Sequence, residues 1–217
     1  MTARSSSRLD RWDAFSFALL AGTIAITAAL YRRLPERVPV HFDLHGNADG
    51  FMARPFGAWI LVALTVFAWC ITRLGALVLP REWRVRLERS PTSILGVLLV
   101  ALFCALQIVV LDAALHPGAS MGRPLALALS AFWIVLGVMM PRVRRNPFVG
   151  VRTTWTLTSD ENWARTHRVA GFAFTIGGAI GLFGALVGSH ATAIVAILLS
   201  GLVPLVYSYL LARKLAG

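Results

Sequence analysis

The sequence predicts an all-α integral membrane protein with six transmembrane helices. Of its 217 residues, 57% are hydrophobic, and the mean hydropathy is +0.70. Only 14% are charged, whereas soluble domains carry about a quarter charged residues. Six apolar runs are each close to the roughly 20 helical residues that cross a hydrocarbon core of about 30 Å. Because six spans leave no room for a soluble domain, we expect one membrane domain.

The spans follow one another with short connections. The first has a basic segment before it, as a signal peptide would, but its apolar run is long and is followed at once by Arg32 and Arg33, so we interpret it as a retained anchor. The first and fourth runs are the shortest and should borrow flanking residues. The short fifth connection predicts that spans five and six form an antiparallel pair. The predicted spans are Ala14–Leu30, Phe56–Leu79, Ser93–Leu115, Pro124–Met140, Val169–Val187 and Ala191–Ala212.

The distribution of basic residues predicts the orientation. Of the 21 Lys and Arg residues, 15 lie in the first tail, the two even-numbered connections and the C-terminal segment, and 5 lie on the other side. The positive-inside rule therefore places both termini and the even-numbered connections in the cytoplasm. The second connection, Pro80–Pro91, is arginine-rich, with Trp83 at headgroup depth. The net charge of +11 is then an orientation and headgroup signal, and we expect no direct nucleic-acid binding.

The motifs of common enzymes and cofactor sites are not evident in the sequence. Cys70 and Cys104 both fall inside apolar spans, which excludes a disulfide framework. There is no HExxH pattern, no nucleophile elbow and no pair of intramembrane aspartates. We therefore predict no catalytic residues, no cofactor and no resident metal.

The first connection, Tyr31–Pro55, is an extracytoplasmic loop rich in proline and glycine, which predicts turns and extended backbone. His41, Asp43 and His45 alternate within it. If the backbone there is extended, the three side chains point to one side, and Asp49 could join them to hold a divalent metal. The favoured alternative is a hydrogen-bonded loop around Gly46 with solvated histidines.

The fourth connection is the densest functional segment of the chain. It reads NPFVGVRTTWTLTSDENWARTHRVAG from Asn146 to Gly171. Thr158 and Glu161 fit a capping box, which predicts an interfacial cytoplasmic helix that starts there and runs into span five. Trp163 and His167 are four residues apart and should share a helix face.

Three further residues of this connection suggest either anchoring or recognition. Trp155, like Trp163, suits the aromatic belt at the membrane surface. Gly150 allows a backbone turn that presents the guanidinium of Arg152 beside it. That group could bind a carboxylate or a lipid phosphate in bidentate fashion. An interfacial helix with ordinary headgroup anchors explains the same residues.

Polar and small residues inside the spans need separate explanations. Asp112 lies near the outer end of span three, with Gln107 five residues earlier. Such a carboxylate is tolerated if it reaches the outer surface or has a partner, and His41 or Arg54 is a candidate partner. We favour a satisfied polar residue at the outer boundary over an ionisable site that faces a cavity. Four glycines on one face of span five predict close helix packing, within the chain rather than between two copies: Gly177, Gly181, Gly184 and Gly188.

Two segments resemble known families. LPERVPVHFDLHGNADGF resembles the loop of the domain of unknown function numbered 1648, through His41, Asp43, Gly46 and Asp49. The Asn146–Gly171 segment resembles the signature of the SdpI family of bacterial membrane immunity proteins. We expect residues 1–79 to form the first region and residues 80–217 the second, within one membrane domain. The signature residues are Asn146, Gly150, Arg152, Trp155, Thr156, Trp163, His167 and Gly171.

The resemblance implies a function in the bacterial plasma membrane. It implies protection against a secreted antimicrobial peptide toxin, and possible retention of a small transcriptional repressor at the membrane. The partners would be the bilayer, a peptide outside and a repressor inside. The alternative is a small multi-pass transporter or exporter, which would need polar residues along a path through several spans. A membrane metalloenzyme built on the first loop is the least favoured hypothesis.

Overall fold

The computed structural model describes residues 11–74, 80 and 91–216. It confirms six helices that are long and apolar enough to cross a membrane. Helical backbone satisfies its own hydrogen bonds, which is what a chain in lipid requires. The spans are formed, in chain order, by α1 (Arg11–Leu30), α3 (Ile60–Leu74), α5 (Thr92–Leu115), α6 (Gly122–Met139), α8 (Asp160–Leu186) and α9 (His190–Ala216). The second span is Arg54–Ile71, so it includes the short helix before α3 as well as most of α3 itself.

Short elements connect the long helices. Between α1 and α3 lie η1 (Tyr31–Arg33), the strands β1 (Arg37–Phe42) and β2 (Ala48–Ala53), and α2 (Arg54–Gly57). Between α6 and α8 lie η3 (Met140–Arg142) and α7 (Thr154–Thr158). The predicted end of span two at Leu79, and the arginines and Trp83 of the second connection, fall outside the described residues.

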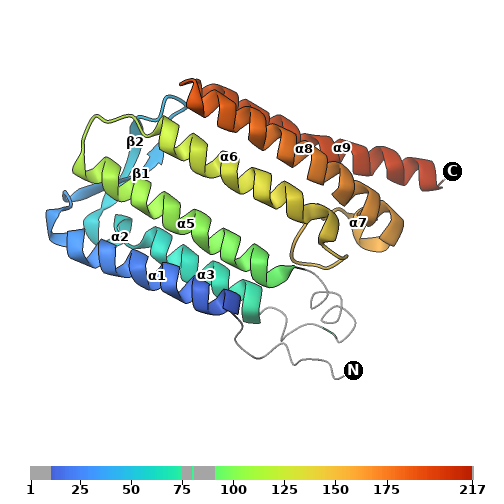
Figure 1. Ribbon diagram of the computed structural model, residues 1–217, viewed down its shortest axis with the longest axis horizontal. Helices are drawn as coiled ribbons and strands as arrows, with labels where there is room; N and C mark the ends of the chain where they lie inside the picture. The colour runs from blue at the N-terminus through green and yellow to red at the C-terminus, as the bar shows by residue number, and fades with distance from the viewer. Residues whose placement is uncertain (1–10, 75–79, 81–90, 217) are drawn as a thin grey trace.

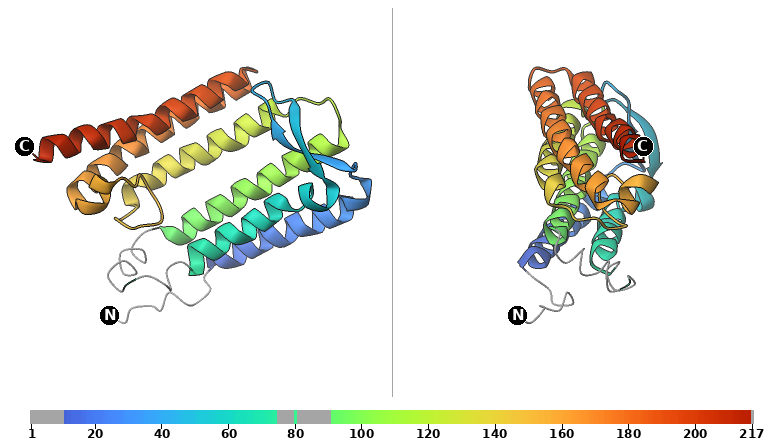
Figure 2. Two further views of the ribbon diagram at one scale, coloured as in Figure 1. Left: turned by 180° about the vertical axis from the view of Figure 1, so that it is seen from behind. Right: turned by 90° about the vertical axis from the view of Figure 1, so that its right-hand side faces the viewer.

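The six helices form two groups that meet along α5 and α6 (Figure 1). In one group α5 packs on α1 and α3, and in the other α8 packs on α6 and α9. The predicted antiparallel pairing of spans five and six is therefore confirmed. The hairpin lies at one end of the bundle and α7 at the other, as Figure 1 and the left view of Figure 2 show. We name these the hairpin end and the α7 end; the sequence predicts that the hairpin end faces outward.

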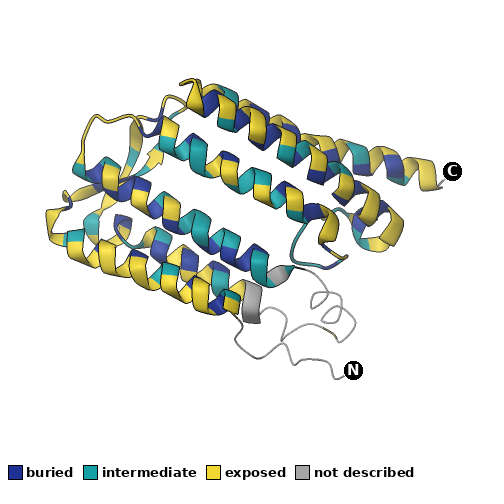
Figure 3. Cartoon of the chain, in the orientation of Figure 1, coloured by how far each residue is buried: buried dark blue, intermediate teal, exposed yellow. Residues whose placement is uncertain are grey.

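Three buried clusters hold this arrangement together. One gathers at the α7 end around Met140, Val143, Trp163 and Phe174. A second gathers at the hairpin end around Leu34, Val38 and Leu111. The third consists of alanines where α6, α8 and α9 converge. Many outward-facing residues of α1, α8 and α9 remain exposed (Figure 3), as expected where lipid covers the helices.

The glycines of α8 pack within the chain, as the sequence predicted. A Cβ added at Gly181 would lie 2.6 Å from the Ser130 hydroxyl of α6, and one at Gly184 would lie 2.8 Å from Thr192 of α9. Small residues thus let three helices converge closely. Gly188 does not belong to this face, because it follows the end of α8 and adopts a φ of 83°.

Candidate functional site

The first outer connection folds into a β-hairpin. β1 and β2 are antiparallel, with Val38 opposite Met52 and His41 opposite Gly50. The chain reverses between Asp43 and Asn47. The Gly46 amide donates to the Asp43 carbonyl at 3.0 Å, and Gly46 has a φ of 82°. A type I turn followed by a left-handed glycine is a common hairpin connection.

The carboxylate of Asp43 stabilises this turn. Its Oδ1 accepts the backbone amides of His45 and Asn47 at 2.8 and 2.9 Å, and its Oδ2 accepts the Asn47 side-chain amide at 3.2 Å. The bond from the Asn47 amide contributes most to lowering the pKa of Asp43 below its ordinary 3.8. Hydrogen bonds to the charged form favour ionisation. Asp43 therefore stabilises the tip of the hairpin.

The hypothesis that His41, Asp43 and His45 point to one side of an extended strand is wrong. β1 ends at Phe42, so Asp43 and His45 belong to the turn and no longer alternate with His41. His41 instead pairs with Asp49 across the hairpin, with Nδ1 and Oδ1 2.5 Å apart. Among the described residues no group of three or more His, Cys, Asp or Glu is placed to hold a metal.

The tip of the hairpin docks on the connection between α5 and α6. The Met121 amide donates to the Gly46 carbonyl at 2.9 Å, and the Ser120 hydroxyl donates to the His45 carbonyl at 2.9 Å. A Cβ at Gly46 would overlap the backbone of Gly122. The hairpin therefore joins the two helix groups at this end of the bundle.

Asp112 is an exposed residue with a polar partner, as the favoured explanation predicted, but that partner is neither His41 nor Arg54. Its Oδ1 lies 2.9 Å from Nδ1 of His116, one helical turn later, and both side chains are more than half exposed. Arg54 instead donates to the Leu34 carbonyl at 3.1 Å and lies over the ring of Tyr31. Asp112 therefore needs no distant partner, because α5 supplies one at i+4.

Gln107 lies deep between the helices of the first group and is fully buried. Its Nε2 donates to the Thr27 hydroxyl of α1 at 3.2 Å and to the Ala58 carbonyl at 2.9 Å. Its Oε1 has no hydrogen-bond partner among the described residues. Interhelical amide bonds of this kind hold membrane helices together, so Gln107 connects α5 to α1 and to the turn between α2 and α3.

At the α7 end, Asn146 organises the loop that enters the signature segment. It is fully buried. Its Nδ2 donates to the carbonyls of Arg144 and Val149 at 2.8 and 3.1 Å. Its Oδ1 accepts the amides of Phe148 and Val149, both at 2.8 Å. One side chain thus satisfies four backbone groups in a loop that has no regular structure.

His167 receives this loop on α8. The Val151 amide donates to Nε2 at 3.2 Å, and Nδ1 lies 2.9 Å from the Trp163 carbonyl. These roles assign the proton to Nδ1, because Nε2 must accept. Gly150 has a φ of 123°, and a Cβ there would overlap the imidazole. Glycine at position 150 is therefore required both for the backbone turn and for room beside His167.

Trp163 and His167 share a helix face, as predicted. Their rings stack with centroids 4.0 Å apart. Trp163 is 3% exposed and its indole donates to the Val143 carbonyl at 2.8 Å. The expectation that Trp163 anchors in the headgroup belt is therefore wrong. The indole is used inside the protein, where a donor needs a partner.

The capping box lies five residues earlier than predicted. Thr153 caps α7, and its hydroxyl accepts the Thr156 amide at 3.2 Å while the Thr156 hydroxyl accepts the Thr153 amide at 2.8 Å. Thr158 is the last residue of α7, and Ser159 caps α8 by accepting the Asn162 amide at 3.1 Å. The prediction that a helix runs on into span five is confirmed, because α8 starts at Asp160.

α8 starts nine residues before the predicted span Val169–Val187. The added turns at its start are polar, and several of their side chains are buried against other helices. Asn162 donates to the Ser208 carbonyl of α9 at 3.0 Å and accepts the Thr166 hydroxyl at 3.0 Å. Trp155 of α7 donates to the Ser208 hydroxyl at 3.0 Å. Sequence reasoning missed Asn162, Thr166 and Ser208. The sequence feature that could have indicated these contacts is the serine at position 208, which lies within an otherwise apolar helix.

Gly171 completes the packing of α8 on α6. A Cβ there would lie 2.8 Å from the Pro141 ring and 3.1 Å from the Gly137 carbonyl. Arg152 differs from the other signature residues because its side chain is exposed. It donates to the Pro147 carbonyl at 2.6 Å. Of the signature residues, most are therefore buried in the packing, and Arg152 is available at the surface.

Family models match both segments discussed above. The SdpI/YfhL protein family matches residues 142–208, and the domain of unknown function DUF1648 matches residues 18–66.

The chain carries an SdpI-family segment with a DUF1648 segment before it.

The DUF1648 match contains the hairpin and its Asp43 turn, and the SdpI match contains the loop, α7, α8 and most of α9. Neither family is a known enzyme family. With its SdpI-family segment and six candidate spans, the chain is a multi-pass cell-membrane protein of the immunity type. No curated protein and no solved structure matches the chain.

Proposed function

We propose that this protein protects its cell against a secreted antimicrobial peptide toxin, with the hairpin as the surface that meets the peptide. The observation that carries this proposal is a hairpin docked rigidly on the α5–α6 connection yet rich in exposed apolar side chains. On the hairpin Leu44 is 63% exposed, Phe51 46% and Met52 37%, and Phe56 of the adjoining α2 is 66% exposed. Apolar groups held at a membrane surface favour contact with an amphipathic peptide.

The second strand offers a further means of contact. Every residue of β2 is at least partly exposed, and within the described part of the chain β1 is its one strand partner. An unpaired strand edge can bind an extended peptide through main-chain hydrogen bonds. The hairpin thus combines apolar side chains with free backbone groups on the side that the arginine distribution predicts to face outward.

Deletion and complementation test this proposal. Cells lacking the gene are challenged with membrane-active peptides secreted by the same strain and its close relatives, then complemented with wild type or variants. Phe51→Asp should abolish protection at unchanged membrane levels, whereas Ala48→Asp, an exposed change on the same strand, should retain it. Equal sensitivity of deleted and complemented cells to every peptide would contradict the proposal.

A second role, retention of a transcriptional repressor, is favoured by the exposed Arg152. Its guanidinium is oriented by the Pro147 carbonyl and lies in the basic connection that the sequence places in the cytoplasm. We infer that it binds a carboxylate of the repressor. Arg152→Ala should release the repressor from membranes without loss of the protein, and Arg142→Ala is the control. A repressor that still sediments with Arg152→Ala membranes would exclude this role.

The polar groups inside the first helix group do not favour a transporter. Thr23, Thr27 and Thr65 donate their hydroxyls to carbonyls one turn earlier on their own helices, at 2.7 to 2.8 Å. Gln107 uses its amide between helices. These groups contribute to helix packing rather than offering a line of free ligands. Substrate flux in proteoliposomes that contain the purified protein would support the transporter hypothesis.

A further inference from the structure

The exposed sides of α8 and α9 form an apolar groove of about 750 Å³. Its walls are two ridges in which residues follow one another at intervals of four, the spacing of a helix ridge. Phe172, Ile176 and Ile180 form the wall on α8. The wall on α9 consists of Val195, Leu199 and Val203.

Small residues make the floor of this groove. Ala173 and Gly177 of α8 face Ala196 and Ser200 of α9. A Cβ at Gly177 would lie 2.5 Å from the Ser200 Cβ, so a larger residue would push the helices apart. The groove is therefore built into the α8–α9 contact, because the close approach of small residues leaves the larger ridges standing on either side.

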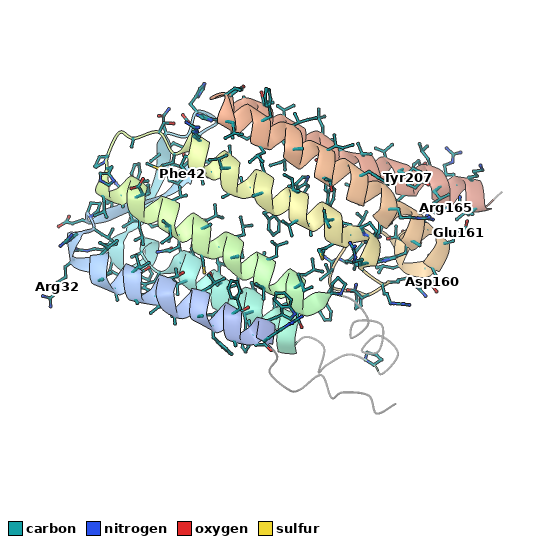
Figure 4. The ribbon with its side chains drawn as sticks, in the orientation of Figure 1. Arg32, Phe42, Asp160, Glu161, Arg165 and Tyr207 are labelled. Atoms are coloured by element: carbon teal, nitrogen blue, oxygen red, sulfur yellow. The ribbon has the colours of Figure 1, made fainter. Side chains whose placement is uncertain are left out.

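One end of the groove is marked by positive charge. Its lining on α8 begins at Val169, and the preceding residue, Arg168, is exposed. Arg168 is one turn before Phe172 on the same ridge. Arg165 lies one turn further back and contacts Glu161 at 3.1 Å; Figure 4 shows this pair near the α7 end of α8. The apolar groove thus opens beside an arginine.

The α8 wall of the groove is about as long as one leaflet of a bilayer. From Val169 to Ile180 the helix rises about 16 Å at about 1.5 Å per residue. Half of a hydrocarbon core of about 30 Å is about 15 Å. An acyl chain lying in the groove would therefore place the phosphate of its own lipid at the level of Arg168. A guanidinium binds a phosphate through two parallel hydrogen bonds.

We propose that the α8–α9 groove binds an acyl chain of an anionic phospholipid, with the lipid phosphate on Arg168. The residues of the two walls contact the acyl chain, and the small residues of the floor make the groove deep enough to hold it. Arg168 selects lipids with net negative charge, because a zwitterionic headgroup cancels most of the attraction at the surface. This site is independent of the proposed immunity function, since it uses neither the hairpin nor Arg152.

Native mass spectrometry of the full-length protein tests this site, with phosphatidylglycerol and phosphatidylcholine of identical acyl chains as probes. Wild type should retain phosphatidylglycerol in preference. Arg168→Gln should weaken its binding about fivefold, as expected for one arginine at a membrane surface, and should leave phosphatidylcholine unchanged. Phe172→Ala should weaken binding of both lipids because it removes part of one wall.

Two matched variants serve as controls. Phe183 is on α8 and 67% exposed but does not line the groove, so Phe183→Ala should bind both lipids as wild type does. Arg213 is exposed on α9 ten residues beyond Val203, so Arg213→Gln should also bind normally. Equal retention of the two lipids, or unchanged binding by Arg168→Gln, would overturn the proposal. A dimer that Phe172→Ala dissociates would instead assign the groove to a second copy of the chain.

Discussion

The imidazole of His167 stacks on the indole of Trp163, with ring centroids 4.0 Å apart and planes inclined by 16°. Each ring also binds the preceding loop, His167 through the Val151 amide and Trp163 through the Val143 carbonyl. The pair therefore attaches both ends of an irregular loop to one face of α8. This arrangement gives the SdpI signature its structural role and leads to the first prediction.

Replacing His167 by alanine should destabilise the α7 end. The buried Val151 amide would lose its acceptor, which costs about 1–3 kcal/mol, and the stack on Trp163 would be lost. Thermal unfolding of the purified protein in detergent measures the change. Ala164→Ser, an exposed substitution on the same helix, should leave the melting temperature unchanged. A His167→Ala protein as stable as this control would show that the contact contributes little.

Gly150→Ala should cost more than Gly118→Ala. Both glycines have positive φ, 123° and 88°, so both substitutions strain the backbone. At Gly118 nothing lies within 4 Å of an added Cβ, whereas at Gly150 the added methyl would overlap His167. We expect about 1 kcal/mol at Gly118 and at least twice that at Gly150. Unfolding in a denaturing detergent gives the two values, and equal losses would refute the overlap at His167.

Gly46→Ala should separate the hairpin from the α5–α6 connection. The methyl would overlap the backbone of Gly122, which cannot move without displacing the start of α6. Hydrogen exchange at Met121, whose amide donates to the Gly46 carbonyl, should become faster by at least tenfold. Gly188→Ala is the control, because Gly188 has a φ of 83° and open space around it. Unchanged protection of Met121 would mean that the docking tolerates a Cβ.

Acid should loosen the hairpin tip. Because the folded state lowers the pKa of Asp43, this carboxylate stabilises the fold above its ordinary value of 3.8, and the contribution is lost as the pH falls through the lowered value. The amide resonances of His45 and Asn47 should therefore shift together below about pH 4. Asp43→Asn should remove that titration. A shift that persists in this variant would assign it to another group.

Gln107→Leu should be better tolerated than Gln107→Ala. Leucine keeps the volume and removes the Oε1 that has no partner among the described residues, so we expect a loss under about 1.5 kcal/mol. Alanine leaves a cavity as well, and we expect about 2–4 kcal/mol. Unfolding in a denaturing detergent compares the two variants. If leucine proved as costly as alanine, the bonds to Thr27 and Ala58 would dominate over packing.

The sequence predicted a helix with a capping box at the α7 end, but it did not predict the position of the cap or the burial of Trp163. Spacing alone placed Trp163 and His167 on one face, because helical periodicity is a local property. The cap was misplaced because both Thr153 and Thr158 are chemically suitable. A further bond supports the cap at Thr153, since the hydroxyl of its box partner Thr156 also donates to the Val151 carbonyl at 2.8 Å. Trp163 was assigned to the membrane surface because its buried acceptor, Val143, is distant in sequence.

At the hairpin end, too, the sequence predicted the kind of backbone but not the side-chain contacts. Proline and glycine correctly indicated turns and extended backbone, but the supposed face of His41, Asp43 and His45 depended on where β1 ends. That limit is set by the turn around Gly46 and its contact with Met121. Likewise, a sequence cannot show that His116, rather than His41, lies against Asp112 until α5 is known to run past Asp112 and to have His116 as its C-cap.

The amino-acid sequence by itself determined the number of spans and the membrane location of the chain, because the transfer of apolar residues into lipid is additive along each run. Tertiary structure alone decided which polar residues are consumed in packing, as for Asn146, Gln107 and His167, and which stay available, as for Arg152. The physical reason is that a buried hydrogen bond depends on partners brought together from separate helices, and their meeting depends on the whole packing arrangement.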